Sequence, residues 1–382
     1  MTSRYRYLLF AAAGILLLSG CQEPQESSAT QGFAGLGADA QAYAQASATT
    51  PLSFPADHGP HPDYRIEWWY LTANLEDEQG TPLGLQWTLF RQALMPPEER
   101  PDPAPWATDQ VWMAHMGISR GATHVAAERF ARSHSAFEDG QAGVVAAPFQ
   151  AWIDDWIFHT PTDRTATGNF NTFELMAYQG AGEQRNGYHL SLQAEGPLVL
   201  HGENGFNAKT FEGQGSHYYS QPFLRITGQV TLAGETRNVS GQGWLDREWS
   251  SQLLSAEQSG WDWFSLHLND DRKLMAYQLR GGGEQGRDYT FAHLIQADGS
   301  TQLKGAGQVT LTPQATDTVA GREVPTRWTM RLPEGNLRLD IQARHPDRWM
   351  STSVPYWEGD VVVRDADSQA ALGVGYLEMT GY

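Results

Sequence analysis

The chain has 382 residues, a hydrophobic content of 40% and a formal net charge of −18. This length accommodates two domains. The negative charge argues against nucleic acid as a partner and against binding to anionic lipid through basic residues, because like charges repel. With 39 glycines, 20 prolines and 14 tryptophans, the composition favours β-structure with many turns.

Residues 1–20 are typical of a bacterial lipoprotein signal peptide. Arg4 and Arg6 precede an apolar run from Leu8 to Leu18, which is too short to span a bilayer. Leu18-Ser19-Gly20-Cys21 follows, and Cys21 is the only cysteine of the chain. A single cysteine excludes a disulfide framework and a thiolate metal site. We expect cleavage before Cys21 and lipidation of its thiol; the alternative is an ordinary signal peptide with a chance cysteine.

Residues 21–51 are predicted to form a flexible tether, because this segment is rich in Gln, Ala, Ser, Thr and Gly and has no apolar periodicity. Gln22 directly follows the cysteine, which by the usual bacterial sorting pattern favours anchoring in the outer membrane, facing the periplasm. The rest of the chain is predicted to form a first domain over residues 52–250 and a second domain over residues 251–382.

The folded region is predicted to open with a segment that caps a barrel. His58 and His61, with two neighbouring aspartates, suggest a metal site, but the prolines around them prevent a helix or strand from aligning the ring nitrogens. No zinc signature and no glycine-rich phosphate loop occurs in the sequence. We therefore expect neither a metal nor a cofactor.

Short strands then recur at intervals of roughly 10 to 15 residues, separated by Gly, Asn and Asp. Tyr64 to Leu75 and Leu83 to Arg91 read as the two strands of a hairpin. Ala126 to Ala136 is the one stretch predicted as a short helix. Many short strands with turn signals predict an all-β fold, a barrel or a sandwich.

The strand pattern occurs twice. Gly241-Gln242-Gly243-Trp244-Leu245-Asp246 and Gly373-Val374-Gly375-Tyr376-Leu377-Glu378 share the pattern Gly-x-Gly-aromatic-Leu-acid. Earlier in each copy, the stretch that begins at Trp263 corresponds to the one that begins at Trp68, and His293 corresponds to His115. Five such matches in the same order indicate an ancient duplication. The matched histidines favour a structural hydrogen bond, with His115 facing a pocket of the first copy as the alternative.

The first closing motif continues into Asp246-Arg247-Glu248-Trp249. Side chains alternate along a strand, so Asp246 and Glu248 are expected to share one face with Trp244, and Arg247 to take the other face. A pair of carboxylates on one face suggests acid–base catalysis. The alternative is a structural ion pair at the domain junction, in which Arg247 bridges Glu67 or Asp262.

Several tryptophan-rich motifs resemble those of the AttH-like, lipocalin-like family, which includes the carotenoid 1,2-hydratases. They lie at His61 to Tyr70, Trp244 to Trp249, Gly260 to Phe264, Tyr356 to Gly359 and Gly375 to Tyr382. The resemblance covers roughly residues 52 to 382. It implies two lipocalin-like β-barrel domains and, for the secreted branch of the family, an ABC-type envelope transporter as a partner.

The carotenoid hydratases protonate an alkene and add water to the resulting cation. Their active-site motif is similar to Asp-His-Asn-Trp, whereas this chain has Asp246-Arg247-Glu248-Trp249. Asp246 and Trp249 match that motif, but Arg247 stands at the position of the histidine. A guanidinium lowers the pKa of a neighbouring carboxyl group, which works against a protonated acid. The departure at Arg247 therefore argues against hydratase activity.

Three functions are considered. The first is an envelope lipoprotein that binds a lipid- or isoprenoid-like small molecule and serves an ABC-type transport system. The second is a hydratase or lyase. The third is a structural role, in which the barrels dock an envelope transporter. The catalytic candidates are Asp246, Glu248 and Asp262, the ligand-binding candidates are Trp68, Tyr70, His115, Tyr218, Trp249 and Trp263, and the candidate structural ion pair is Arg247 with Glu67. An apolar pocket within reach of Asp246 or Glu248 is required by the enzyme hypothesis.

Overall fold

The computed structural model describes residues 40–104, 106–137, 140–161, 170–255, 257–281, 288–305, 308–333 and 337–382. These described residues all belong to one compact unit. In the described ranges, no helix reaches the length and hydropathy that a membrane span requires. The predicted signal peptide and the lipidation of Cys21 lie outside the described residues.

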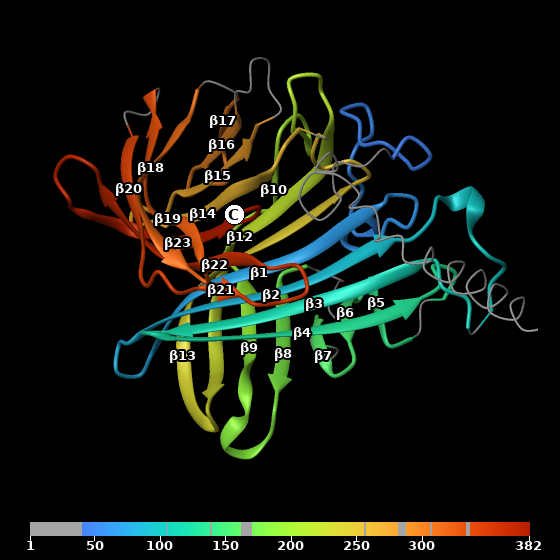
Figure 1. Cartoon of the computed structure of the whole chain (residues 1–382), viewed down its shortest axis with the longest axis horizontal. Coiled ribbons are helices and arrows are strands. Elements are labelled where there is room, and N and C mark those ends of the chain that lie inside the picture. Colours follow the sequence, from blue (N-terminus) through green and yellow to red (C-terminus); the bar gives the residue numbers. More distant parts are fainter. Residues whose placement is uncertain are drawn as a thin grey trace, which may run out of the picture. The chain divides into compact units, whose positions relative to one another are not determined.

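Thirteen strands of the described residues form the first sheet (Figure 1). Their bounds are β1 (Ile66–Asp77), β2 (Pro82–Ala93), β3 (Gln110–Arg120), β4 (Thr123–Ser133), β5 (Ala142–Ala146), β6 (Phe149–Ile153), β7 (Trp156–His159), β8 (Thr172–Gln179), β9 (Asn186–Ala194), β10 (Val199–Leu200), β11 (Phe206–Ala208), β12 (Gly215–Leu232) and β13 (Glu235–Ser250). The order is β4-β3-β2-β1-β13-β12-β9-β8-β7-β6-β5, with β10 and β11 also paired to β12. This sheet curls into a nearly closed barrel.

Ten strands of the described residues form the second sheet, a half-barrel. Their bounds are β14 (Gly260–Leu268), β15 (Lys273–Arg280), β16 (Tyr289–Ile295), β17 (Thr301–Lys304), β18 (Thr310–Val319), β19 (Arg322–Leu332), β20 (Leu337–Ala343), β21 (Trp349–Met350), β22 (Tyr356–Asp365) and β23 (Ala371–Met379). The order is β17-β16-β15-β14-β23-β22-β20-β19-β18, with β21 paired to β22. Among the described residues, the remaining elements are three short 3-10 helices, η2 (Ala56–His58), η3 (Pro97–Glu99) and η5 (Gly182–Gln184).

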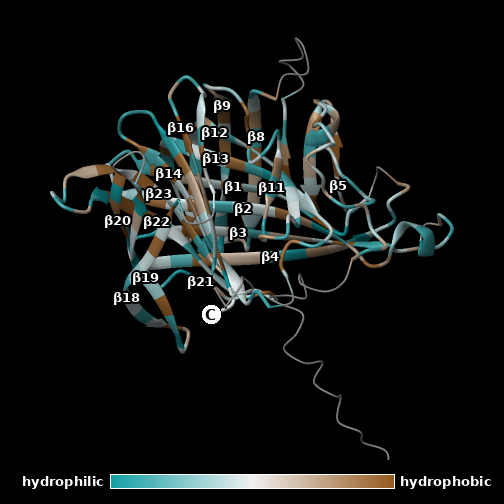
Figure 2. Ribbon diagram, turned by 90° about the horizontal axis from the view of Figure 1, so that it is seen from above, coloured by the Kyte–Doolittle hydropathy of each residue, from teal (hydrophilic) through white to brown (hydrophobic). Residues whose placement is uncertain are grey.

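The predicted all-β, two-domain lipocalin-like fold is confirmed. Alternation along the strands explains how each sheet forms its core. Along β1, Trp69, Leu71 and Leu75 are buried inside the first barrel, and burying each such side chain contributes about 1.5–3 kcal/mol. Figure 2 shows hydrophobic and hydrophilic residues interspersed along the strands of both sheets. The second sheet has its own core, which includes Phe264 and Trp328.

The helix predicted over Ala126 to Ala136 is wrong. This stretch belongs largely to β4, which pairs antiparallel with β3 along its whole length. Its alanines, Glu128 and Arg129 are good helix formers, so local propensity alone favours a helix. The strand forms instead because β4 pairs with the backbone groups along the exposed edge of β3.

The duplicated closing motif has a steric cause in both copies. Gly241 lies opposite Leu75, and a Cβ at Gly241 would collide with the carbonyl oxygen of Asn74. Gly373 lies opposite Leu268, and a Cβ there would collide with the carbonyl oxygen of His267. Each closing strand therefore approaches its neighbour too closely for any residue with a side chain.

The strand register corrects two of the predicted correspondences between the copies. Asp246 lies opposite Tyr70 and Glu378 lies opposite Trp263, so Trp263 matches Tyr70 and not Trp68. Across the first sheet, Tyr70 lies opposite Thr88 on β2, and Thr88 lies opposite His115 on β3.

Across the second sheet, Trp263 lies opposite Tyr277 on β15, and Tyr277 lies opposite Phe291 on β16. His115 therefore matches Phe291, and His293 lies two residues further along β16. His115 and His293 are therefore not equivalent positions, so their pairing does not support a shared structural hydrogen bond.

The two sheets meet through faces that point away from their own cores. Asn74 Nδ2 on β1 donates to the Gly375 carbonyl oxygen on β23 at 2.9 Å. A third hydrophobic cluster combines side chains of both sheets, including Tyr70 and Trp244 from the first and Trp263 and Tyr277 from the second. The surfaces between the sheets are therefore as much a buried interior as the two cores.

The last part of the predicted tether, residues 40–51, lies against the folded region. Ala40 is buried. The Ala44 amide donates to the Asp63 carbonyl oxygen at 3.0 Å, and the Ala44 carbonyl oxygen accepts a hydrogen bond from Ser251 at 2.5 Å. These hydrogen bonds attach the segment to the folded region, although its composition alone predicts a flexible tether.

Candidate functional site

A cavity of about 250 Å³ lies between the two sheets and takes side chains from both. Its ring-bearing lining residues are Trp68, Tyr70, Phe90, His115, Phe130, Tyr218, Trp261, Trp263, Tyr277 and Tyr356. Its aliphatic lining residues include Ile66, Val111, Met113, Leu253, Leu279 and Val354, and its charged or acidic ones are Lys209, Asp246, Glu248 and Glu378. Phe130 is 47% exposed, so the cavity approaches the surface beside β4.

Strand alternation decides which side chains reach this cavity. On β1, residues 66, 68 and 70 line it, whereas the residues between them face the barrel core or Arg247. The same spacing of two places Asp246 and Glu248 of β13 in the lining. The cavity is therefore formed by the outer face of the first barrel together with the second sheet.

Asp246 is a buried carboxyl group held by three donors. Trp244 Nε1 donates to Oδ1 at 2.7 Å, Ser220 Oγ donates to the same oxygen, and the Tyr218 hydroxyl donates to Oδ2 at 2.9 Å. Burial raises the pKa of Asp246 to about 7, although these hydrogen bonds oppose the rise. Glu248 adds to the rise. Asp246 is thus poised to exchange a proton near neutral pH.

Glu248 lies two residues further along the same face but in a different environment. Lys209 Nζ lies 2.8 Å from Glu248 Oε1, and Ser216 Oγ donates to the same oxygen. The Lys209 ammonium group also lies 4.2 Å from the centre of the Tyr277 ring. The two carboxyl groups that the sequence pairs therefore differ, because Glu248 has a cationic partner, whereas Asp246 has none within the described part of the chain.

The second sheet contributes another pair of carboxyl groups, of which one, Glu378, lines the cavity. Glu378 lines the cavity and accepts a hydrogen bond from Trp261 Nε1 at 2.6 Å. Burial raises the pKa of Glu378 to about 7. Glu358 lies opposite Glu378 on β22 and accepts a hydrogen bond from the Tyr70 hydroxyl at 2.5 Å. Burial and the neighbouring Glu378 raise the pKa of Glu358 well above its ordinary value.

Five of the six predicted ligand-binding residues line the cavity: Trp68, Tyr70, His115, Tyr218 and Trp263. Tyr218 is central, because its hydroxyl donates to Asp246 and accepts from Trp263 Nε1 at 3.1 Å. His115 Nδ1 lies 2.9 Å from the Tyr356 hydroxyl. Burial lowers the pKa of His115 to about 4, so the ring is neutral at neutral pH.

Trp249 and Asp262 lie on the opposite faces of their strands and do not line the cavity. The Trp249 ring stacks on the His61 ring at 3.9 Å. Asp262 Oδ1 lies 2.6 Å from Arg280 Nη1 and 2.8 Å from the Tyr382 hydroxyl. Both positions follow from alternation, since each is an odd number of residues from a lining neighbour.

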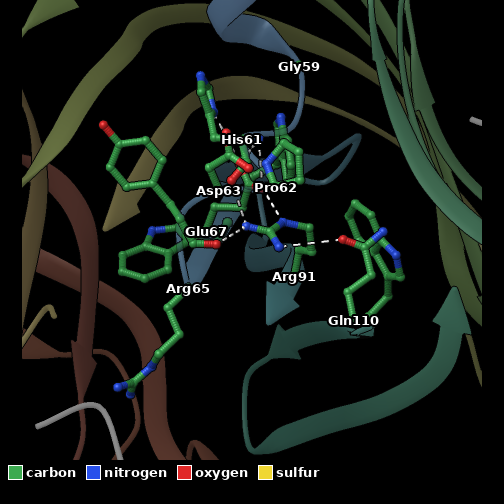
Figure 3. Close-up of polar contacts among 12 residues, drawn as sticks. Gly59, His61, Pro62, Asp63, Arg65, Glu67, Arg91 and Gln110 are labelled. Atoms are coloured by element: carbon green, nitrogen blue, oxygen red, sulfur yellow. Dashed lines mark hydrogen bonds and ion pairs between the residues drawn. The ribbon is translucent and has the colours of Figure 1, made fainter. Parts of the chain in front are cut away.

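Arg247 points away from Asp246 into a buried ion-pair cluster formed by Glu67, Arg91, Arg247 and His61. Glu67 accepts from Arg91 and Arg247 through different oxygens, and Arg91 Nη2 donates to the His61 carbonyl oxygen at 2.9 Å. Figure 3 shows Arg91 reaching from Glu67 towards Gln110. The Arg247 guanidinium also lies 3.8 Å from the centre of the Trp69 ring.

This cluster joins strands β1, β2 and β13 to the segment before β1, which the sequence predicts to cap the first barrel. Burial by itself raises the pKa of Glu67, but Arg91 and Arg247 outweigh it and hold that pKa well below its ordinary value. The capping segment is fixed further by His58, which stacks on Phe170 at 3.7 Å. Among the described residues, no group of three or more His, Cys, Asp or Glu side chains is placed to hold a metal ion.

Sequence reasoning missed Glu378, Glu358, Lys209 and Tyr356 as site residues. The repeated closing motif contained a signal for Glu378, because Glu378 occupies the position of Asp246 in the second copy. Tyr356 and Glu358 lie in one of the motifs that carried the family resemblance. Lys209 follows directly after β11 and belongs to no motif, so only the fold brings it to Glu248.

Comparison with known proteins agrees with this architecture. The AttH-like family model matches residues 45–382. A candidate AttH from Nitrosomonas europaea is 33% identical, with a TM-score of 0.76, over 89% of this chain and 99% of that one. Among curated proteins, no sequence matches.

Two more distant structures share the fold. Kievitone hydratase from Nectria haematococca is 14% identical, with a TM-score of 0.62, over 88% of this chain and 95% of that one. CghA in complex with Sch210972 is 13% identical, with a TM-score of 0.54, over 90% of this chain and 97% of that one. The family match over most of the chain, together with the two sheets and their repeated closing strands, shows that this protein belongs to the AttH-like family.

Proposed function

We propose that this protein is an acid–base enzyme of the hydratase or lyase class. It adds water to a carbon–carbon double bond of an apolar small molecule, or removes water to form such a bond. The observation that carries the proposal is Asp246, a buried carboxyl group that has no cationic partner among the described residues and faces a largely apolar cavity. A carboxylic acid that stays protonated near neutral pH can donate a proton to a carbon–carbon double bond.

The geometry supports a two-step addition. The π electrons of the double bond take the proton of Asp246, which becomes a carboxylate, and a cation remains on the neighbouring carbon. The faces of aromatic side chains such as Trp68 and Trp263 stabilise a cation electrostatically. Water then adds to the cation and gives its extra proton to a carboxylate, for which Glu378 on the opposite wall is the candidate. Dehydration is the reverse.

Arg247 does not oppose this chemistry. It lies on the far face of β13, where it pairs with Glu67. The pKa of Asp246 is raised in spite of the adjacent guanidinium, because burial is the largest influence on it. The shared fold with kievitone hydratase also favours a hydratase over other enzyme classes.

A labelled-water assay tests the proposal. The purified protein is incubated with a panel of isoprenoid alkenes in water carrying a heavy oxygen isotope, and the products are examined by mass spectrometry. We expect at least one alkene to gain one labelled water. Binding of panel members to the cavity without any labelled product would reject the enzyme and favour the carrier described next.

The second candidate is a carrier that binds a lipid- or isoprenoid-like molecule and releases it unchanged. It is favoured by the apolar part of the lining, which includes Ile66, Val111, Leu279 and Val354. In either case we propose that Cys21 carries a lipid anchor in the outer membrane, facing the periplasm, and that the protein serves an ABC-type envelope transport system. The signal-peptide pattern before Cys21 supports the anchor, and the family resemblance supports the transporter.

A further inference from the structure

Asp246 stands at one end of a hydrogen-bonded chain that crosses from the first sheet to the second. Ser220 Oγ on β12 donates to Asp246 Oδ1 and also lies 2.6 Å from His201 Nε2. His201 Nδ1 in turn lies 2.8 Å from Nδ1 of His293 on β16. All four side chains are at most 1% exposed, so no bulk water competes for these contacts.

The chain has one consistent direction when Asp246 is ionised. A neutral imidazole has one N–H donor and one bare acceptor nitrogen. Ser220 must then donate to the carboxylate, His201 must donate to Ser220 through Nε2, and His293 must donate to His201 through Nδ1. The remaining nitrogen of His293, Nε2, is buried and has no hydrogen-bond partner among the described residues.

The direction reverses as a whole when Asp246 is protonated. Asp246 then donates to Ser220, Ser220 donates to His201 Nε2, and His201 donates through Nδ1 to His293 Nδ1. His293 carries its proton on Nε2 in this state. Both arrangements satisfy every contact in the chain, and they differ only in where the protons lie.

We propose that Ser220, His201 and His293 form a proton relay that returns a proton to Asp246 after it has protonated a substrate, which rests on the proposed acid role of Asp246. A proton that reaches the buried His293 Nε2 binds there while the Nδ1 proton of His293 passes to His201 Nδ1. The Nε2 proton of His201 passes to Ser220, and the Ser220 proton passes to Asp246. The net change is one proton taken up at His293 Nε2 and one gained by the Asp246 carboxylate, and both rings end as the opposite neutral tautomers.

The surroundings favour neutral rings. Burial lowers the pKa of His293 to about 4 and that of His201 well below its ordinary value, where the charges of His293 and Lys209 add to the effect. A relay through neutral tautomers therefore avoids placing a lasting charge between the sheets. The groups that face Asp246 are Tyr218 and Trp244, which donate to it, and Glu248, whose charge raises its pKa.

Nuclear magnetic resonance tests the relay without any substrate. Full-length protein is labelled with 15N in histidine, and the tautomers of His201 and His293 are followed between about pH 5 and about pH 9. Signals are assigned with H201Q and H293Q. In parallel, the infrared carboxyl band that disappears in D246N reports the protonation of Asp246. We expect both rings to exchange tautomers with the same midpoint as that band.

Two variants separate the relay from an ordinary structural hydrogen bond. In S220A the link between carboxyl and ring is lost, so the tautomers should no longer change with the Asp246 band. S119A is the matched control, because Ser119 Oγ lies 2.9 Å from Nδ1 of His124, a histidine that does not belong to the proposed relay. The change should persist in S119A.

The outcomes distinguish the relay from the proposed function. If the Asp246 band titrates and either ring keeps one tautomer throughout, the relay is rejected and the acid role of Asp246 stands. If the band shows Asp246 ionised at every pH, the acid role fails and the relay fails with it. The wild-type titration alone decides between these outcomes, whether or not S220A folds.

Discussion

Asp246 and Arg247 are adjacent in the chain, yet their side chains belong to two different parts of the molecule. Asp246 faces the cavity between the sheets, and Arg247 contacts Glu67 in the cap of the first barrel. A β-strand separates them because successive side chains point to opposite faces. The motif thus places a cavity-lining carboxyl group and a buried ion pair on opposite faces of one strand.

Replacement of the acid should abolish catalysis. We expect Asp246→Asn to lower the rate of alkene hydration about 10²- to 10⁴-fold, because an amide cannot donate a proton to carbon. The measurement is formation of labelled alcohol under single-turnover conditions. Asp262→Asn is the matched control, since Asp262 is also a buried aspartate but faces away from the cavity. Equal losses in both variants would contradict the assignment.

The stability of the protein should fall as the pH rises towards neutral. The folded-state pKa of Glu378 is raised from 4.5 to about 7, so its contribution is fully present below about pH 4 and is lost as the pH rises through about 7. We expect Glu378→Gln to remove part of this fall, roughly 3 kcal/mol at most. Urea unfolding at about pH 5 and about pH 8 measures it.

The control for this titration is Glu183→Gln, because Glu183 is exposed. This variant should show the wild-type difference between the two pH values. A Glu378→Gln protein with the full wild-type difference would mean that Glu378 is ionised in the folded state.

Loss of the buried anion in the cap should be costly. Glu67→Gln leaves Arg91 and Arg247 without their carboxylate in a buried site, so we expect a loss of about 3–5 kcal/mol in the free energy of unfolding. Asp155→Asn removes the partner of Arg129 at a site where the carboxylate is 76% exposed. That control should change the free energy by less than about 1 kcal/mol, and a similar effect for both would contradict a structural role for the cluster.

Filling the cavity should block binding of apolar probes. Val354 is half-buried, lines the cavity and precedes β22. Val354→Trp should weaken binding of the fluorescent probe N-phenyl-1-naphthylamine about ten-fold or more, because the added ring occupies a cavity of about 250 Å³. Leu94→Trp, at a side chain that is 50% exposed, is the control. Unchanged probe affinity in Val354→Trp would place the binding site elsewhere.

Membrane attachment should depend on one thiol. We expect Cys21→Ser to abolish lipidation and to release the protein from the membrane fraction, because stable anchoring takes more than one acyl chain and this variant carries none. Mass spectrometry of the N-terminal peptide and cell fractionation measure this. Cys21 is the only cysteine, so persistence of the Cys21→Ser protein in the membrane fraction would show an attachment that does not involve a lipidated thiol.

Much of the site could be predicted because strand alternation is a local property. The spacing of two residues predicts that Asp246 and Glu248 share one face of β13 and that Arg247 takes the other, and the side chains lie in this way. Applied to Trp249 and Asp262, the same rule excludes both from the cavity. The helix over Ala126 to Ala136 failed for the opposite reason, since pairing with β3 overrides local propensity.

The repeated closing motif, the tryptophan-rich family pattern and the alternation along β13 were all determined by the sequence itself, because each depends on neighbours within a few residues. Only the tertiary structure decided that the cavity lies between the sheets and that Lys209, Glu358 and His201 approach its acidic groups. These contacts join residues far apart in the chain. The raised pKa of Asp246 depends on the same packing, because burial is its main cause and burial exists only once the two sheets meet.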